Sequence, residues 1–248
     1  MTTSSSPSGA AAPTVRTHPD ADALAHSVAV SLVHRLATWQ AEGREPVVAL
    51  TGGTIAERIH ALVPTLDTSS VDWTRVDVWF GDERYVAADS ADRNDLAAVR
   101  DLLEPLGVPA DRVHRVPAAD GPGADVDAAA AAYAEELRAA GGRFDLVMLG
   151  LGPDGHVASL FPGFPQLGAD GTAVGVRESP KPPAERVSLT FAALDRTDEV
   201  WFLVSGEGKA DAVRRALAAD GSVTETPARG VTGGDHTWWL DEDAASAL

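Results

Sequence analysis

The side chains of this chain that are best suited to proton transfer are Asp154 and His156, in the stretch LGLGPDGHVASLFPG (149–163). A histidine exchanges protons near neutral pH, and a neighbouring carboxylate can orient it. Glycines surround the pair, so packing gives little reason for a histidine there. We therefore predict an acid–base role for His156. The other histidines, at 18, 26, 34, 60, 114 and 236, are expected at the surface or in packing, and Ser159 is not expected to be a nucleophile.

The glycines at 150, 152 and 155 also spell G-x-G-x-x-G after an apolar run, as in a dinucleotide-binding turn. Three features argue against a bound dinucleotide. Pro162 and Gly163 would end the next helix within two turns. The acid that should end a strand about 20 residues later is missing, because Asp170 falls in a loop. Asp154 would also repel a pyrophosphate. We interpret the stretch as a catalytic loop and expect no cofactor.

Three other segments carry groups that can bind an anionic substrate. In the stretch Thr51–Thr54 (TGGT), two glycines permit a tight turn before a predicted helix, whose N-terminus would attract anions; an ordinary strand–helix turn explains it equally well. Residues 82–84 (DER) place three charges after a predicted strand, where they are costly to desolvate unless paired. Lys209, in GEGKA, can bind one phosphate, although the stretch lacks the first glycine and the Ser/Thr of a P-loop.

Apolar spacing predicts strands that alternate with helices. The first helix should be capped by Asp20 and stopped by Gly43. Strands are expected at 47–50, 76–80, 111–117, 143–152, 185–190, 199–206 and 237–241, and later helices at 55–63, 94–107 with Asn94 as a cap, 123–142 and 208–221. This order predicts an α/β fold with three layers, a mostly parallel Rossmann-like sheet covered by helices on both faces. The apolar strand FDLVM should be central, and the loop 179–185 should join strands of one sheet.

Composition limits the class of protein. The 248 residues carry a formal net charge of −17, which disfavours nucleic acid and anionic membranes as partners. The chain has no cysteine and shows no clustered histidines, so we expect no metal site and a cytoplasmic location. No apolar run is long enough to span a membrane. Residues 1–15 read as a disordered tail, and residues 16–248 as a single domain.

Five motifs in order, TGGT, DERYV, GLGPDGHVASLFPG, RVSLT and SGEGKA, resemble those of the 6-phosphogluconolactonases, which share a fold with the glucosamine-6-phosphate deaminases. The resemblance spans about residues 45–240. Deaminases have a related block with a glutamate that assists ring opening, whereas this chain has no acid between His156 and Asp170. The motifs therefore favour the lactonase branch.

The resemblance implies hydrolysis of 6-phospho-D-glucono-1,5-lactone to 6-phosphogluconate. His156 would be the general base on water, and Asp154 would orient it or the water. The implied site also includes Arg84 as a catalytic group, and Thr51, Gly52, Gly53, Thr54, Asp82, Arg84, Gly152, Arg186 and Lys209 as groups that bind the substrate or its phosphate. An isomerase-deaminase and a non-catalytic sugar-phosphate sensor on the same fold are the alternatives.

Overall fold

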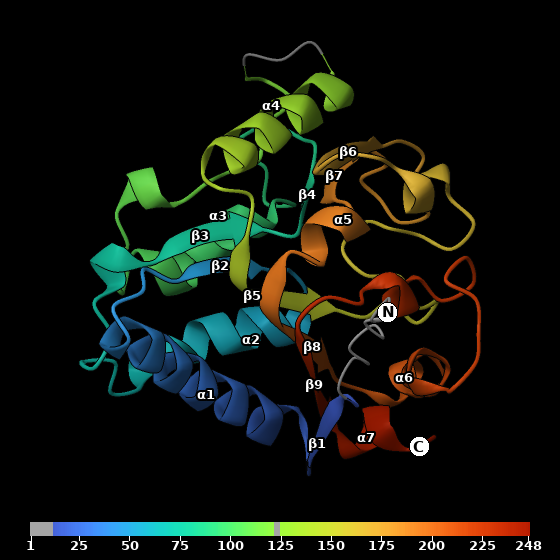
Figure 1. Ribbon diagram of the computed structural model, residues 1–248, viewed down its shortest axis with the longest axis horizontal. Coiled ribbons are helices and arrows are strands. Elements are labelled where there is room, and N and C mark those ends of the chain that lie inside the picture. Colours follow the sequence, from blue (N-terminus) through green and yellow to red (C-terminus); the bar gives the residue numbers. More distant parts are fainter. Residues whose placement is uncertain (1–11, 122–124) are drawn as a thin grey trace, which may run out of the picture.

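A six-stranded parallel sheet forms the centre of the computed structural model, which describes residues 12–121 and 125–248 (Figure 1). The strand order is β1 (Thr14–His18), β9 (Asp235–Asp241), β8 (Thr197–Val204), β5 (Phe144–Gly150), β2 (Val47–Leu50) and β3 (Asp77–Phe80). All neighbouring pairs are parallel. The strand FDLVM lies inside β5, between β8 and β2, so its predicted central position is confirmed.

A second sheet of three short antiparallel strands joins β4 (Asp82–Arg84), β7 (Arg186–Leu189) and β6 (Ala173–Val176). The loop 179–185 joins β6 to β7, which pair in this sheet, so the expectation that it joins strands of one sheet is confirmed. The preceding strand expected from sequence, β5, belongs instead to the large sheet. The DER segment was expected just beyond a strand, but it is itself the strand β4. The strand β7 matches the prediction at 185–190, whereas β4 consists of three charged residues and β6 of only four residues, too few to show a clear alternation.

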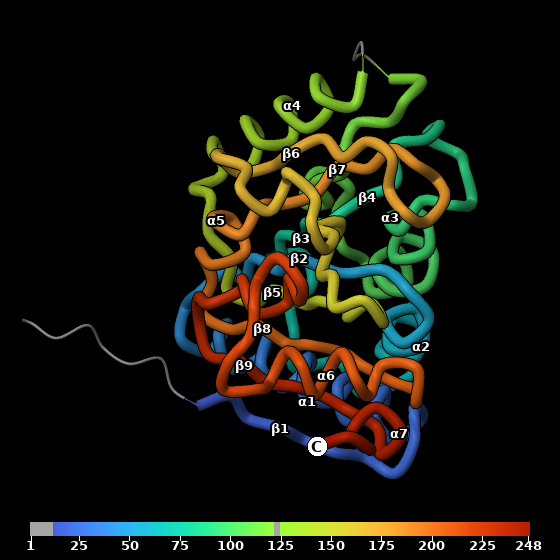
Figure 2. Tube along the Cα trace, turned by 90° about the vertical axis from the view of Figure 1, so that its right-hand side faces the viewer, coloured from blue at the N-terminus to red at the C-terminus, as the bar shows by residue number. Residues whose placement is uncertain are grey.

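Helices cover both faces of the large sheet, as predicted (Figures 1 and 2). On one face, a buried cluster joins the sheet to α1 (Ala21–Ala41), α2 (Thr54–Leu62) and α3 (Asn94–Ala98). On the other, a cluster joins it to α4 (Val126–Ala139), α5 (Phe191–Leu194), α6 (Ala210–Leu217) and α7 (Glu242–Ala245). The neighbours Trp238 and Trp239 belong to opposite clusters, because successive strand residues face opposite sides. The three-layer α/β fold is therefore confirmed.

Local capping confirms some of the predicted helix ends and corrects others. Asp20 accepts a hydrogen bond from the N–H of Ala23 at 2.8 Å, as a cap of α1 should. Asn94 is not a cap: it is the first residue of α3, whose N-cap is Arg93.

The strand predicted at 111–117 reduces to one bridge between Val113 and Val78. Turns, rather than a short helix, follow the glycine-rich loop.

The predicted tail, residues 1–15, is too long at its end, since Thr14 and Val15 pair with β9 in β1. Residues 1–11 lie outside the described part of the chain. Because residues of both sheets, such as Val187 and Val147, share one buried cluster, we infer that the region from β1 onward forms a single domain. Within the described ranges, none of the helices has the length and apolar character needed to cross a bilayer.

His60 should make stability fall in mild acid. It is 3% exposed on α2, neither ring nitrogen has a hydrogen-bond partner among residues 12–121 and 125–248, and burial lowers its pKa from 6.5 to about 4. Between these values the unfolded chain binds a proton that the folded chain does not, so the free energy of unfolding falls as pH falls, by about 3 kcal/mol for this group. Urea titrations between pH 7 and pH 4 give the free energy of unfolding at each pH, and His60→Leu should lose this part of its fall with pH. His26→Leu, on the exposed side of α1, should keep it; equal slopes in all three proteins would contradict the prediction.

Candidate active site

A cleft of about 440 Å³ opens where the carboxyl ends of β2 and β5 meet β4 and β7. Ten of the predicted site residues line it: Thr51, Gly52, Gly53, Thr54, Asp82, Arg84, Gly152, His156, Arg186 and Lys209. Asp154 is absent from the lining and reaches the cleft only through its contact with His156. The fold therefore brings the predicted residues together, as expected for strand ends of a parallel sheet. Their individual roles stay predictions.

The Asp154 carboxylate lies against the imidazole of His156. Asp154 Oδ1 is 2.5 Å from Nδ1, and the ring packs against Phe161 with centroids 4.6 Å apart. Burial alone would raise the pKa of Asp154, but the hydrogen bond and charge of His156 outweigh it and lower this pKa to about 2. Asp154 is therefore an anion at neutral pH. With Nδ1 bonded to it, Nε2 is the ring nitrogen left for a substrate or water.

Gly152 makes room for this pair. A Cβ at this position would lie 2.0 Å from His156 Nδ1 and 2.4 Å from Asp154 Oδ1, far inside contact distance. The N–H of Gly152 also donates to the carbonyl of His156 at 2.9 Å, which closes the loop on itself. The imidazole and carboxylate thus rest directly on the backbone of residue 152, and only glycine permits this arrangement.

The TGGT stretch forms the other wall of the cleft. Gly53 is the N-cap of α2 with φ of 97°, and the helix has no side-chain cap, so its first N–H groups remain for an anion. Thr51 Oγ1 accepts the N–H of Gly150 at 3.3 Å, which ties this wall to the end of β5. Gly52 is needed for packing, because a Cβ there would lie 1.9 Å from Asn94 Oδ1.

Three cations predicted from sequence are fixed around the cleft by main-chain carbonyls. Lys209 Nζ donates to the carbonyl of Leu151 at 2.6 Å, and Arg84 Nη1 to that of Asp92, also at 2.6 Å. Arg186 donates to the carbonyls of residues 181–183 at 2.9–3.2 Å. Burial lowers the pKa of both Lys209 and Arg186. Lys209 and Arg186 are thus held in place with their charges poorly solvated, a condition that strengthens attraction to an anion.

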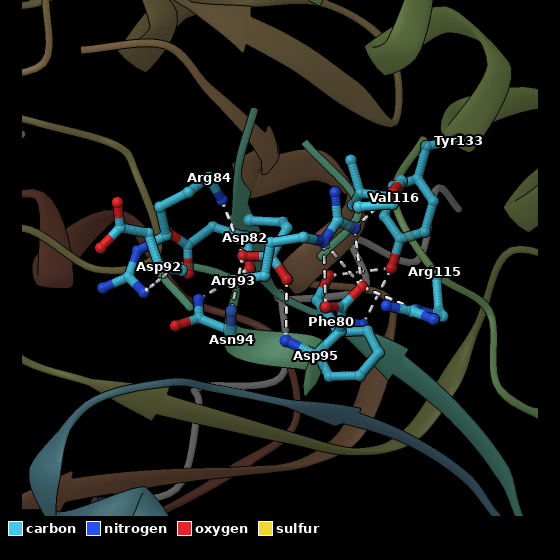
Figure 3. A network of polar contacts seen from close by, with 12 residues as sticks. Phe80, Asp82, Arg84, Asp92, Arg93, Asn94, Asp95, Arg115, Val116 and Tyr133 are labelled. Carbon is cyan, nitrogen blue, oxygen red and sulfur yellow. Dashed lines mark hydrogen bonds and ion pairs between the residues drawn. The ribbon is translucent and has the colours of Figure 1, made fainter. Parts of the chain in front are cut away.

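A buried polar network surrounds β4 and the start of α3, next to the cleft (Figure 3). The fully buried Glu83 carboxylate accepts the N–H groups of Arg84, Asn94 and Asp95, each at 2.8 Å. Burial, followed by the charge of Asp95, raises the pKa of Glu83 to about 7 against the effect of these N–H donors. Arg93 and Arg115 both donate to Asp95. The DER segment thus combines a structural anchor, Glu83, with two residues that face the cleft.

Asp82 and Ser159 join the catalytic loop to β4. The buried Ser159 hydroxyl donates to Asp82 Oδ2 at 2.6 Å, and its N–H donates to Ser188 Oγ at 3.1 Å. Ser159 is fully buried and is absent from the cleft lining; that it is no nucleophile stays a prediction. Asp82 Oδ2 is also 4.0 Å from Arg186 Nη1, so Asp82 helps to balance a buried cation.

Comparison with known proteins identifies the family of this chain. The model of the family described as glucosamine-6-phosphate isomerases/6-phosphogluconolactonase matches residues 19–239. The chain belongs to this family. It is 41% identical to the 6-phosphogluconolactonase of Streptomyces coelicolor, over 95% of this chain and 94% of that protein, and 40% identical to that of Mycobacterium tuberculosis, over 93% and 96%. The crystal structure of 6-phosphogluconolactonase from Thermotoga maritima, 28% identical, superposes with a TM-score of 0.81 over 92% of this chain and 99% of that one. The resemblance inferred from the motifs is confirmed.

Four polar residues that line the cleft were not predicted from sequence as site residues: Arg58, Asn94, Lys181 and Ser205. Arg58 follows the TGGT stretch by one helical turn, and Ser205 precedes the GEGKA stretch directly, so their spacing from those motifs was an available signal. Asn94 and Lys181 come from segments whose folding over the cleft depends on tertiary contacts. Across the described residues, no three His, Asp or Glu side chains gather as a metal site would require.

Proposed function

We propose that this protein hydrolyses 6-phospho-D-glucono-1,5-lactone to 6-phosphogluconate, the second step of the oxidative pentose phosphate pathway. The observation that carries the proposal is the pairing of Asp154 with His156 in a cleft whose other wall is an uncapped helix N-terminus with cations nearby. The two relatives described above, about 40% identical over nearly their whole length, carry that activity in their names.

A lactone is an activated ester, so water can attack it without a covalent enzyme intermediate. His156 Nε2 takes a proton from the water as its oxygen bonds to C1 of the lactone. The imidazolium is stabilised by the Asp154 anion, 2.5 Å from Nδ1. It then gives the proton to the ring oxygen as the bond from C1 to that oxygen breaks, which leaves a free carboxylic acid and a hydroxyl. The carboxylic acid ionises to solvent.

The phosphate of the substrate is assigned to the far wall of the cleft. The N-terminus of α2, Lys209 and Arg186 offer N–H groups and charge for a dianion. Binding a remote group there fixes C1 relative to His156, so that binding energy serves the chemical step. Arg84 and Asp82 are assigned to the sugar hydroxyls and the reacting carbonyl.

Two other activities on this fold are less well supported. Among the described residues that line the cleft, Asp82 is the one carboxylate, and no glutamate stands where a deaminase has its ring-opening acid. A sugar-phosphate sensor would have no need of the Asp154–His156 pair. Purified protein added to freshly made lactone, with product followed through a coupled 6-phosphogluconate dehydrogenase, tests the proposal. A rate no faster than spontaneous hydrolysis would overturn it.

Removing a cation proposed to bind the phosphate should weaken substrate binding more than it slows turnover. Lys209→Ala or Arg186→Ala removes a charge that holds the substrate before and during the reaction alike, so we expect KM to rise at least tenfold with kcat within about threefold. Initial rates over a range of lactone concentrations, corrected for spontaneous hydrolysis, give both constants. An unchanged KM in both variants would remove these residues from the phosphate site.

The remaining predictions from sequence are part of this proposal. We expect a small anionic substrate, no nucleic-acid partner because of the net charge of −17, and a cytoplasmic location. We also expect no cofactor, since the proposed chemistry needs only water and a base.

A further inference from the structure

Arg215, near the end of α6, holds the catalytic loop from outside the cleft. Within the loop 152–156, the carbonyl of Gly152 accepts the N–H of Gly155, and that of His156 accepts the N–H of Gly152. The carbonyls of Pro153 and Asp154, which lie between these two in the chain, turn towards Arg215. Arg215 Nη2 donates to the carbonyl of Pro153 at 3.1 Å, and Nη1 donates to that of Asp154 at 3.5 Å. One guanidinium therefore serves the two peptide groups that lead into the Asp154–His156 pair.

The guanidinium of Arg215 is itself fixed on two sides. Its Nε donates to Asp211 Oδ2 at 2.9 Å, one turn back on α6, and Nη1 donates to Thr226 Oγ1 at 2.7 Å. Its side chain is 29% exposed, against 53% for its neighbour Arg214. A planar fork with five donors can meet these acceptors together, whereas a lysine ammonium would reach only some of them.

The turn that contains Thr226 packs closely on the same loop. The N–H of Ala228 donates to the carbonyl of Gly155 at 3.0 Å. Gly155 has φ of 91°, and a Cβ there would lie 2.9 Å from Thr226 Cγ2. The turn is also tied to α6, because Arg229 Nη1 donates to the carbonyls of Arg215 and Ala218 at 2.9 and 2.7 Å. The helix end, the turn and the catalytic loop thus form one connected unit.

We propose that Arg215 is a positioning residue for the reaction, which keeps the loop in the conformation that presses the Asp154 carboxylate against His156. The inference rests on the proposed lactone hydrolysis. Arg215 does not line the cleft, so it acts through the loop and not on the substrate. The N-terminus of α2 and Arg186 bind the phosphate from other elements, so loss of Arg215 should reduce kcat and leave KM nearly unchanged.

The test compares Arg215→Ala with Arg214→Ala in the lactone assay. Both changes remove one arginine from adjacent positions of α6, and among the described residues Arg214 bonds only to Asp211. We expect kcat of Arg215→Ala to fall about 10–100-fold with KM within about twofold, because small displacements of a catalytic base are costly. Arg214→Ala should match the wild type. Arg215→Lys should recover part of the lost kcat, since an ammonium can meet one of the acceptors.

Different results would overturn the two proposals separately. A wild-type protein without lactonase activity overturns the proposed function before any variant is made. With an active wild type, a kcat within twofold in Arg215→Ala, an equal loss in Arg214→Ala, or a KM that rises as kcat falls overturns the positioning role. Thermal melts establish that each variant is folded. If Arg215→Ala does not fold, Thr226→Val decides: it removes one acceptor of Arg215, and an unchanged kcat there overturns the inference.

Discussion

His156→Ala should lower kcat/KM by about 10²–10⁴, the contribution expected of a general base. The imidazole stands in the cleft with Nδ1 bonded to Asp154, and no other histidine among the described residues lines that cleft. The alanine variant retains Lys209 and Arg186, the cations proposed to bind the phosphate, so the loss should fall mainly on kcat. A loss smaller than tenfold, measured after subtraction of spontaneous hydrolysis, would contradict the assignment of His156 as the general base.

Asp154→Asn provides the graded companion to that experiment. The amide keeps the shape of the side chain but removes the charge that stabilises the imidazolium, so we expect a smaller loss in the same direction. Because the pKa of Asp154 is lowered to about 2, its titration should leave no inflection in rate profiles above about pH 4.

The sequence was most informative where a local pattern determines the structure. The apolar run FDLVM required a strand buried on both faces, and β5 lies in the interior of the sheet with its residues divided between the two cores. Asp154 and His156 were recognisable as a pair because a single loop residue, Gly155, separates them, so their side chains can meet. The ends of β2 and β5 could be placed side by side because parallel strands share a carboxyl edge.

Features that depend on tertiary contact were not accessible in this way. The strands β4 and β6 have three and four residues and depend on pairing with β7, so neither has a clear pattern of its own. The edge strand β1 is mostly exposed and shows little hydrophobic bias. The residue type of Asn94 suits a helix cap, but Glu83, distant in the chain, is the residue that accepts the N–H groups at that helix end.

The glycine at 152 illustrates the same limit, and it leads to the second large effect. Sequence alone suggested that the glycines of this loop shape a turn. In the structure, the space left by the missing side chain of Gly152 is occupied by the imidazole and the carboxylate. Gly152→Ala would place a methyl group 2.0 Å from His156 Nδ1 and 2.2 Å from its Cε1. Either the ring or the loop must then move by roughly an ångström or more, and we expect kcat to fall about 10²-fold or more.

A double-mutant cycle separates this mechanism from general damage to the fold. In the His156→Ala background the imidazole that the methyl group would displace is already gone, although the methyl group would still lie 2.4 Å from Asp154 Oδ1. Adding Gly152→Ala there should therefore lower kcat less than about a further threefold, and the two losses should be far from additive. Gly168→Ala is the matched control, because a Cβ there meets no atom within 4 Å. It should retain wild-type rates and melting temperature. Full additivity of Gly152→Ala and His156→Ala would mean that residue 152 acts on something other than the imidazole, and the cradle assigned to it here would have to be abandoned.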